Sequence, residues 1–337
     1  GNKEGGILAS RWALQVAQAR IVEATRTHNV DAIIFHGRGG TPARGGGTTE
    51  QLVESTPKGA IRNVLRLTEQ GEVVSQHYSL HPLAMRTLER SFAALARATA
   101  HVEDRFSPGE EQRAAMNLMA AESLAAYRRL VFEPRDFQAY FRGVTPIDVI
   151  ERMHIAARPA AQEDAEGLQA LRALPWVFAW TQSRHTLPGW YGMGTGLAAA
   201  LERHGEGLIG EMLSRWPFFA HLFDDVEAML ARTDLEIAAH YDELVPAELR
   251  RHAGEIRAEY DLTVRSVLKL RGSAKLLDSD PTLQRAIKLR NPYIDPMHLM
   301  QVDLLKRWRA TQRNDTALFQ ALLATISGIA QGLQATG

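Results

Sequence analysis

The spacing of apolar residues predicts that most of this chain is helical. In residues 7–28 apolar side chains recur every three or four positions, which is the period of one face of an α-helix. The same spacing continues through most of the chain after Met85. It predicts further helices over residues 86–104, 110–131, 196–214, 222–243, 247–272, 298–312 and 315–333.

Runs of β-branched and aromatic residues predict a few short strands. Residues 30–35 have the composition of a buried strand, and residues 61–68 and 73–78 predict two more. The aromatic run at residues 176–180 is a fourth candidate. A helix followed by a strand, a loop and further strands is typical of an α/β barrel or a layered sheet.

These two patterns divide the chain into a mixed part and a helical part. We predict a mainly α fold in which residues 1–200 contain part of an α/β (TIM-like) barrel. Residues 201–337 are expected to form a helical C-terminal region. The sequence contains no fixed-period repeat and no low-complexity linker between the two.

The densest chemical signal is a glycine-rich loop that follows the first predicted strand. Six of the eleven residues 37–47 are glycine. Glycine lets backbone N–H groups approach an anion closely, and Arg38 and Arg44 add planar cations that match a phosphate or a carboxylate. In barrels the loops after strands build the active site. The loop therefore predicts a mobile lid that closes on a small, strongly anionic ligand.

Other interpretations of this loop fit the sequence less well. A P-loop requires Gly-Lys-Ser/Thr after its glycines, and this loop has none. A dinucleotide-binding turn that starts at Gly37 requires glycine where Pro42 stands. RNA-binding Arg-Gly-Gly tracts are long and disordered, whereas this loop abuts a predicted buried strand. A plain structural loop is the remaining alternative.

The composition excludes several classes of protein. Acidic and basic residues balance at 39 each, so charge does not favour nucleic acid or an anionic membrane as a partner. The absence of cysteine excludes disulfides, thiolate metal sites and cysteine nucleophiles. No apolar run approaches the ~18 residues that span a membrane, and no signal peptide opens the chain, so we expect a cytoplasmic protein.

Eight segments resemble, in order, motifs of the phosphoenolpyruvate carboxylase family. They are residues 2–6 (Asn-Lys-Glu-Gly-Gly), 35–47 (the glycine-rich loop), 68–72 (Thr-Glu-Gln-Gly-Glu), 158–160 (Arg-Pro-Ala), 171–182 (Leu-Arg-Ala-Leu-Pro-Trp-Val-Phe-Ala-Trp-Thr-Gln), 216–219 (Trp-Pro-Phe-Phe), 290–296 (Arg-Asn-Pro-Tyr-Ile-Asp-Pro) and 336–337 (Thr-Gly). The resemblance therefore covers the chain from end to end.

The resemblance implies a carboxylation. The family converts phosphoenolpyruvate and bicarbonate to oxaloacetate and phosphate, an anaplerotic fixation of carbon dioxide. The implied site residues are Lys3, His36, Arg38, Gln70, Arg158 and Arg172. Arg38 and Arg172 would grip the substrate phosphate, Arg158 would lie near substrate or bicarbonate, and Lys3, His36 and Arg38 would be catalytic. From the residues alone, the alternatives are that His36 is a half-buried residue at a strand end and that Arg172 is a surface ion-pair partner.

The resemblance also implies a site at which aspartate or malate inhibits the enzyme. The matching positions are Arg44, Arg232, Arg290 and Ala335. Arg232 replaces a lysine of the family, and Ala335 replaces an asparagine. Loss of one hydrogen bond to a charged ligand weakens binding by ~1.5–3 kcal/mol, or about one to two powers of ten. We therefore expect weak or absent inhibition by dicarboxylates.

The family's catalytic histidine and metal ligands match no residue here, so no metal ligand is assigned in this chain. The resemblance implies Mg²⁺ or Mn²⁺ in a longer enzyme, with ligands upstream of residue 1. The chain is accordingly expected to be the C-terminal portion of a homotetrameric enzyme and to be inactive alone. The rival hypothesis is a non-catalytic regulatory or assembly module that binds anions through the same loop.

Overall fold

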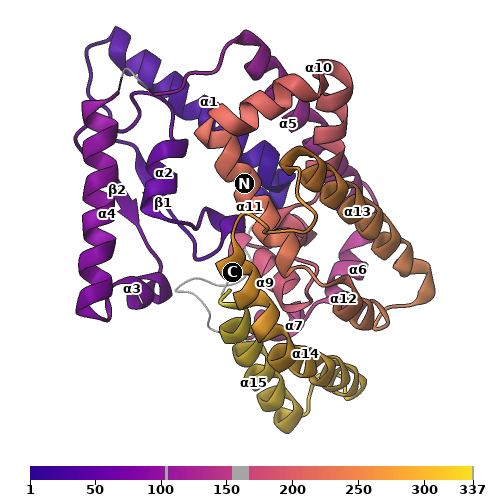
Figure 1. Ribbon diagram of the computed structural model, residues 1–337. Helices are drawn as coiled ribbons and strands as arrows, with labels where there is room; N and C mark the ends of the chain where they lie inside the picture. Colours follow the sequence, from indigo (N-terminus) through magenta and orange to yellow (C-terminus); the bar gives the residue numbers. More distant parts are fainter. Residues whose placement is uncertain (103–104, 154–166, 336–337) are drawn as a thin grey trace.

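The computed structural model describes residues 1–102, 105–153 and 167–335, so Arg158 and the terminal Thr-Gly lie outside the described residues. Its helices are α1 (Asn2–Thr27), α2 (Thr49–Ser55), α3 (Gly71–Tyr78), α4 (His81–Ala100), α5 (Glu110–Val131), α6 (Phe137–Val144), α7 (Ile147–Ile150), α8 (Gly167–Ala170), α9 (Ala173–Gln182), α10 (Met193–Arg215), α11 (Pro217–Arg232), α12 (Leu235–Asp242), α13 (Arg251–Arg271), α14 (Pro281–Ala310) and α15 (Thr316–Leu333). The strands are β1 (Phe35–Gly37) and β2 (Arg66–Thr68), and the 3-10 turns are η1 (Pro42–Arg44), η2 (Leu187–Gly189) and η3 (Ala247–Arg250). Figure 1 shows the strands with α2, α3 and α4 on one side of the molecule, and α14 and α15 at another end.

The mainly α fold predicted from the sequence is confirmed. Helix α5 (Glu110–Val131) and helix α15 (Thr316–Leu333) follow the predicted ranges within a residue. The predicted helix over 222–243 is two helices, because the chain leaves α11 at Thr233 and Asp234 then caps α12. The Asp234 carboxylate accepts hydrogen bonds from the backbone N–H groups of Glu236 and Ile237.

Two of the predicted strands are wrong. Residues 73–78 lie in α3, and the aromatic run 176–180 lies in α9. Every residue from Pro175 to Gln182 is buried, so α9 has no polar face and shows none of the alternation that marks a surface helix. A short apolar run of this kind does not distinguish a buried helix from a buried strand.

The two strands pair in parallel. Phe35 pairs with Arg66 and Gly37 with Thr68, so the predicted strand at 30–35 is reduced to its last residue and two beyond it. In the described part of the chain these strands form a two-stranded sheet, and they do not establish a barrel. Because parallel strands share their direction, the segments that follow β1 and β2 leave the sheet at the same edge.

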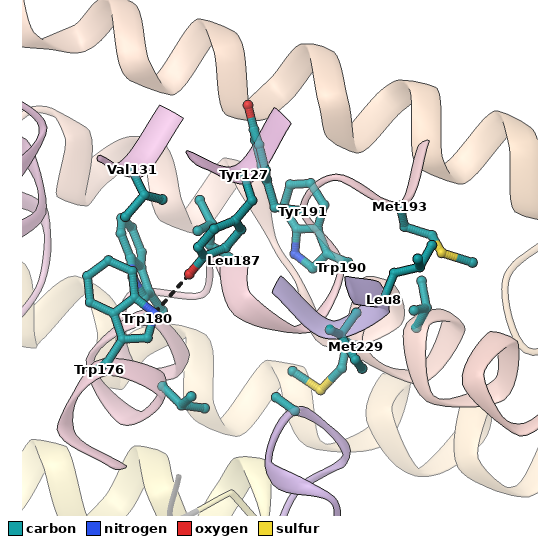
Figure 2. Packing of buried hydrophobic residues seen from close by; sticks show 14 of the residues in the cluster. Leu8, Tyr127, Val131, Trp176, Trp180, Leu187, Trp190, Tyr191, Met193 and Met229 are labelled. Carbon is teal, nitrogen blue, oxygen red and sulfur yellow. Dashed lines mark hydrogen bonds between the residues drawn. The ribbon is translucent and has the colours of Figure 1, made fainter. Parts of the chain in front are cut away.

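The main core is rich in aromatic side chains. Figure 2 shows Tyr127 of α5 beside Trp176 and Trp180 of α9, with Trp190 nearby, and all four side chains are fully buried. The indole N–H of Trp176 donates a hydrogen bond to the Tyr127 hydroxyl at 3.1 Å. The same core includes residues of α1, α5, α10, α13 and α15, so it draws on both parts of the chain. Buried residues of α2 and α4 form a separate small cluster. The division near residue 200 stays a prediction.

Helices α5 and α10 approach each other so closely that α10 needs glycine at the contact. A Cβ on Gly196 would lie 2.6 Å from the carbonyl oxygen of Met119. We expect Gly196→Ala to destabilise the protein by about 1–3 kcal/mol, the usual effect of overpacking. Gly207→Ala on the same helix is the matched control, because a Cβ there meets nothing within 4 Å. Thermal unfolding followed by helical circular dichroism measures both, and equal midpoints would contradict the prediction.

Helix α15 corrects one expectation from the sequence. By length and composition alone it could cross a membrane, so the statement that no apolar run approaches that length was too strict. One such helix is weak evidence, because the core helix of a globular protein passes the same test. Here α15 packs along α14, and Leu322, Ile326 and Ile329 are fully buried.

Candidate active site

The parallel strands bring Arg38 and Gln70 to one edge of the sheet. The backbone N–H of Arg38, just past β1, donates to the carbonyl oxygen of Thr68 at the end of β2 at 3.2 Å. Gln70 is the N-cap residue of α3. Glu69, which precedes it, exerts its charge on Arg38. Ligands of α/β proteins bind at the carboxyl ends of parallel strands, so this edge is the natural place for a substrate.

The glycine-rich loop is folded around the side chain of Arg38. The Arg38 Nε donates to the carbonyl oxygen of Gly45 at 3.2 Å, and its Nη2 donates to those of Gly47 and Thr48. Burial lowers the pKa of the Arg38 guanidinium, and the Glu69 carboxylate opposes that shift. Thr48 then starts α2 with a capping box in which Gln51 is the partner. Arg38 therefore holds the glycine-rich loop closed by hydrogen bonds to the loop's own backbone.

His36 lies in β1 with its ring buried. Its Nε2 is buried and has no hydrogen-bond partner among the described residues. Burial lowers the pKa of the imidazole, and the positive charge of Arg38 lowers it further. The ring is thus neutral at physiological pH and can accept or donate one hydrogen bond without adding charge.

Asn2 and Lys3, at the start of α1, hold two segments that the sequence assigns to the site and that lie far apart along the chain. The amide of Asn2 donates to the carbonyl oxygen of Ala43 in the glycine-rich loop. The ammonium of Lys3, which is buried, donates to the carbonyl oxygens of Gln169 at 2.9 Å and Leu171 at 2.7 Å. Arg172 follows at once, as the N-cap residue of α9. Lys3 therefore fixes the backbone that carries Arg172.

A cleft of about 580 Å³ lies between the glycine-rich loop, α3, α4 and the C-terminal residues. Arg38 and Arg232, which the sequence assigns to two different sites, both line it. Gln334 brings the last described turn of the chain to the same cleft. Arg90 also lines it and pairs with Glu50 at 2.9 Å, but Arg97 pairs with the same carboxylate at 2.6 Å, so two arginines share one anion.

Arg232 and Arg290 lie close enough to repel one another. Burial lowers the pKa of the Arg232 guanidinium, and the charge of Arg290 adds to that effect. The Arg232 Nε is buried without a hydrogen-bond partner among the described residues. Ala335 lies instead in a small apolar cluster with Ile294 and Ile329. The backbone of Arg44 ends the η1 turn of the loop.

The sequence did not predict three residues that hold the segments around the cleft in place. Arg184 is fully buried, and its guanidinium donates to Asp295 Oδ1 at 3.1 Å and to the carbonyl oxygen of Arg232 at 3.2 Å. Arg11 contacts the glycine-rich loop and pairs with Asp225, and neither residue belongs to a motif. No pattern in the sequence signals these three residues, because each acts through a partner far along the chain.

The described side chains do not provide a metal site. Within residues 1–102, 105–153 and 167–335, no group of three or more His, Asp or Glu side chains is placed to hold an ion. A divalent cation therefore has no set of ligands in the described part of this chain.

The fold brings arginines and a glycine-rich loop together at this edge of the sheet. Comparison with known proteins gives the family of the chain. The phosphoenolpyruvate carboxylase family model matches residues 1–337. This chain belongs to the phosphoenolpyruvate carboxylase family, which confirms the resemblance found in the sequence.

Curated relatives are named phosphoenolpyruvate carboxylase. One from Xanthomonas oryzae pv. oryzae is 46% identical over 337 residues, which cover 99% of this chain and 37% of the relative. One from Roseiflexus castenholzii is 41% identical, covering 100% of this chain and 37% of the relative. One from Pseudomonas aeruginosa is 41% identical, covering 99% and 38%. The chain thus spans a little over a third of the length of these relatives.

Proposed function

We propose that this chain acts within a longer protein that carboxylates phosphoenolpyruvate with bicarbonate, giving oxaloacetate and phosphate. The observation that carries the proposal is the placement of Arg38 and Gln70 at one edge of a parallel sheet, beside a glycine-rich loop. The family membership and the curated relatives support the same reaction. The chain would supply most of the cationic groups that hold the substrate.

The reaction requires two anions to be held together. A bicarbonate oxygen attacks the phosphorus of phosphoenolpyruvate, and the bond from phosphorus to the enol oxygen breaks, giving carboxyphosphate and the pyruvate enolate. Carboxyphosphate then separates into CO₂ and phosphate, its carboxyl proton passing to the phosphate. The third carbon of the enolate attacks CO₂ to form oxaloacetate. Arginines that stabilise charge on the phosphoryl group and the enolate lower both barriers.

The site residues take roles that follow from their positions. Arg38 would exchange the carbonyl oxygens of its own loop for the substrate phosphate. Arg172 would bind the same group, as the family resemblance implies. Lys3 holds the backbone before Arg172, so its proposed role is to position that arginine. The neutral ring of His36 would position the substrate by a hydrogen bond. Arg158 stays a proposal for binding substrate or bicarbonate.

Further parts of the proposal rest on the resemblance. Mg²⁺ or Mn²⁺ would be held by residues that are not in this chain. The parallel pair β1 and β2 would belong to a barrel that the rest of the longer protein completes. We further propose a homotetramer that works in the cytoplasm. Exposed apolar side chains such as Phe92 and Tyr293, which are 74% and 80% exposed, would then lie in contacts with the missing part or with other subunits.

A coupled carboxylation assay tests the proposed function. Purified longer protein with phosphoenolpyruvate, bicarbonate and Mg²⁺ should form oxaloacetate, read as NADH oxidation by added malate dehydrogenase. The 337-residue chain alone should form none under the same conditions. A longer protein that binds phosphoenolpyruvate but forms no oxaloacetate would favour the regulatory module over the enzyme.

Inhibition by dicarboxylates is expected to be weak. Arg232 and Arg290 provide positive charge, but Ala335 has no side-chain amide to bind the ligand and is buried among apolar side chains. One missing hydrogen bond to a charged ligand corresponds to about one to two powers of ten in affinity. Aspartate titrated into the carboxylation assay should therefore inhibit only at millimolar concentration. A low-micromolar inhibition constant would refute this expectation.

A further inference from the structure

The η1 turn (Pro42–Arg44) is the part of the glycine-rich loop that packs against the rest of the protein. It contacts both α1 and α11. Thr41 and Ala43 are buried, and the backbone N–H groups of Gly45 and Gly46 donate to the carbonyl oxygens of Pro42 and Thr41 at 3.1 Å and 2.7 Å. The position of this turn therefore sets the position of the loop on either side of it.

One arginine of α1 joins this turn to α11. The Nη2 of Arg11 donates to the carbonyl oxygen of Pro42 at 3.0 Å and to Asp225 Oδ2 at 2.7 Å. The side chains of Arg11 and Asp225 are only 25% and 16% exposed. A partly buried, charge-assisted hydrogen bond of this length holds its partners more firmly than a surface ion pair does.

Asp225 lies among several cationic groups and one further carboxylate. Its charge acts on Arg38 of the loop and on Arg232, seven residues further along α11, as well as on Arg11. The neighbouring His221 and Asp224 of α11 also act on it. Burial raises the pKa of the Asp225 carboxyl to about 6, against the attraction of Arg11.

We propose that Arg11 and Asp225 are positioning residues that clamp the η1 turn and so hold the glycine-rich loop, with Arg38, in the place where it receives the substrate. This inference rests on the proposed function. Neither residue lines the cleft, and Arg11 touches the loop through the backbone carbonyl oxygen of Pro42, so the clamp adds no contact to substrate. It acts on how often the loop occupies its binding-competent position.

The clamp predicts a specific kinetic signature. If the loop is competent only part of the time, the apparent affinity falls by that fraction, whereas saturating substrate restores the competent state. Arg11→Ala in the longer protein should therefore raise KM for phosphoenolpyruvate about tenfold and leave kcat within about twofold. Arg11→Lys should recover most of the loss, because one nitrogen of Arg11 makes both bonds and an ammonium can replace it.

Asp225→Asn tests the charge separately. It keeps the shape of the side chain and removes the anion, so it should raise KM and combine with Arg11→Ala less than additively. In the wild type Asp225 is ionised above about pH 6 and neutral below it, so KM should rise as the pH falls through that value. The pH profile of KM for Asp225→Asn should lack this rise. Changes in KM that are caused by titration of the substrate, His36, His221 or Asp224 should remain in both proteins.

Two controls separate the possible outcomes. Arg20→Ala, at an exposed position of the same helix, should behave as the wild type. Hydrogen exchange at the amides of Gly45 and Gly46 should quicken in Arg11→Ala and not in Arg20→Ala. A fall in kcat with KM unchanged, or unaltered exchange, would overturn the clamp. A wild type that forms no oxaloacetate would refute the proposed function instead, and the exchange data would still decide whether the clamp exists.

Discussion

Arg38→Ala in the longer protein should reduce kcat/KM for phosphoenolpyruvate by about 10²–10³. The substitution removes a cation from the loop at the edge where β1 and β2 end. Because charge on the transferring phosphoryl group grows toward the transition state, both kcat and the affinity should fall. Steady-state carboxylation kinetics with phosphoenolpyruvate as the varied substrate measure the effect.

Two further variants locate the cause of this loss. Arg38→Lys keeps the charge without the planar fork, so it should recover only part of the rate. Arg113→Ala, at an exposed position of α5, should leave the kinetics unchanged. Calorimetric titration of phosphoenolpyruvate then shows whether Arg38→Ala has lost the binding step. Wild-type kinetics in Arg38→Ala would show that Arg38 does not bind the substrate phosphate.

The present position of Arg38 indicates what the loop must do when substrate arrives. Its guanidinium now satisfies three carbonyl oxygens of residues 45–48, and a phosphate would compete for the same donors. Releasing those carbonyl oxygens frees Gly45 and Gly47, both of which have positive φ. The η1 turn stays in contact with α1 and α11. The loop would then move as a flap about a fixed turn, which refines the lid predicted from its glycines.

The parts of the site that the sequence predicts are those whose chemistry is concentrated in one segment. Six glycines and two arginines within residues 37–47 indicate an anion site with no knowledge of the fold. The amphipathic spacing of α5 likewise predicts a helix, because one face is buried and the other is exposed. Where burial is complete, as in α9, that signal disappears and the prediction fails.

The parts that the sequence does not predict depend on contacts between distant residues. Arg11 and Asp225 are 214 positions apart, and each alone is an ordinary charged residue of a helix. Lys3 matches a family motif, but only the fold shows that it holds the backbone 168 residues away, before Arg172. Local pattern therefore predicts which groups meet the substrate, whereas tertiary contacts decide what keeps those groups in place.

Arg184→Ala should loosen the part of the fold that carries Arg232 and Arg290. The Arg184 side chain is 1% exposed and lies at the centre of a polar network. Its partners are Asp234, Asn291, Asp295 and the carbonyl oxygen of Arg232, so it joins α11, α12 and α14. Removing one member of a buried ion pair costs about 3–5 kcal/mol, and we expect about 3 because both carboxylates are partly exposed.

Hydrogen exchange is the appropriate measurement for this variant, because opening of α14 and α15 need not unfold the whole protein. A loss of about 3 kcal/mol corresponds to exchange faster by roughly 10²-fold in α12, α14 and α15. Helices α1 and α5, which pack against each other and supply no hydrogen-bond partner of Arg184, provide the internal reference. Arg307→Ala, at an exposed position of α14, is the matched control. If exchange rose equally in all helices, Arg184 would be a general core residue. A rise confined to these three helices would mean that a single buried cation holds the wall of the cleft to which Arg232 belongs.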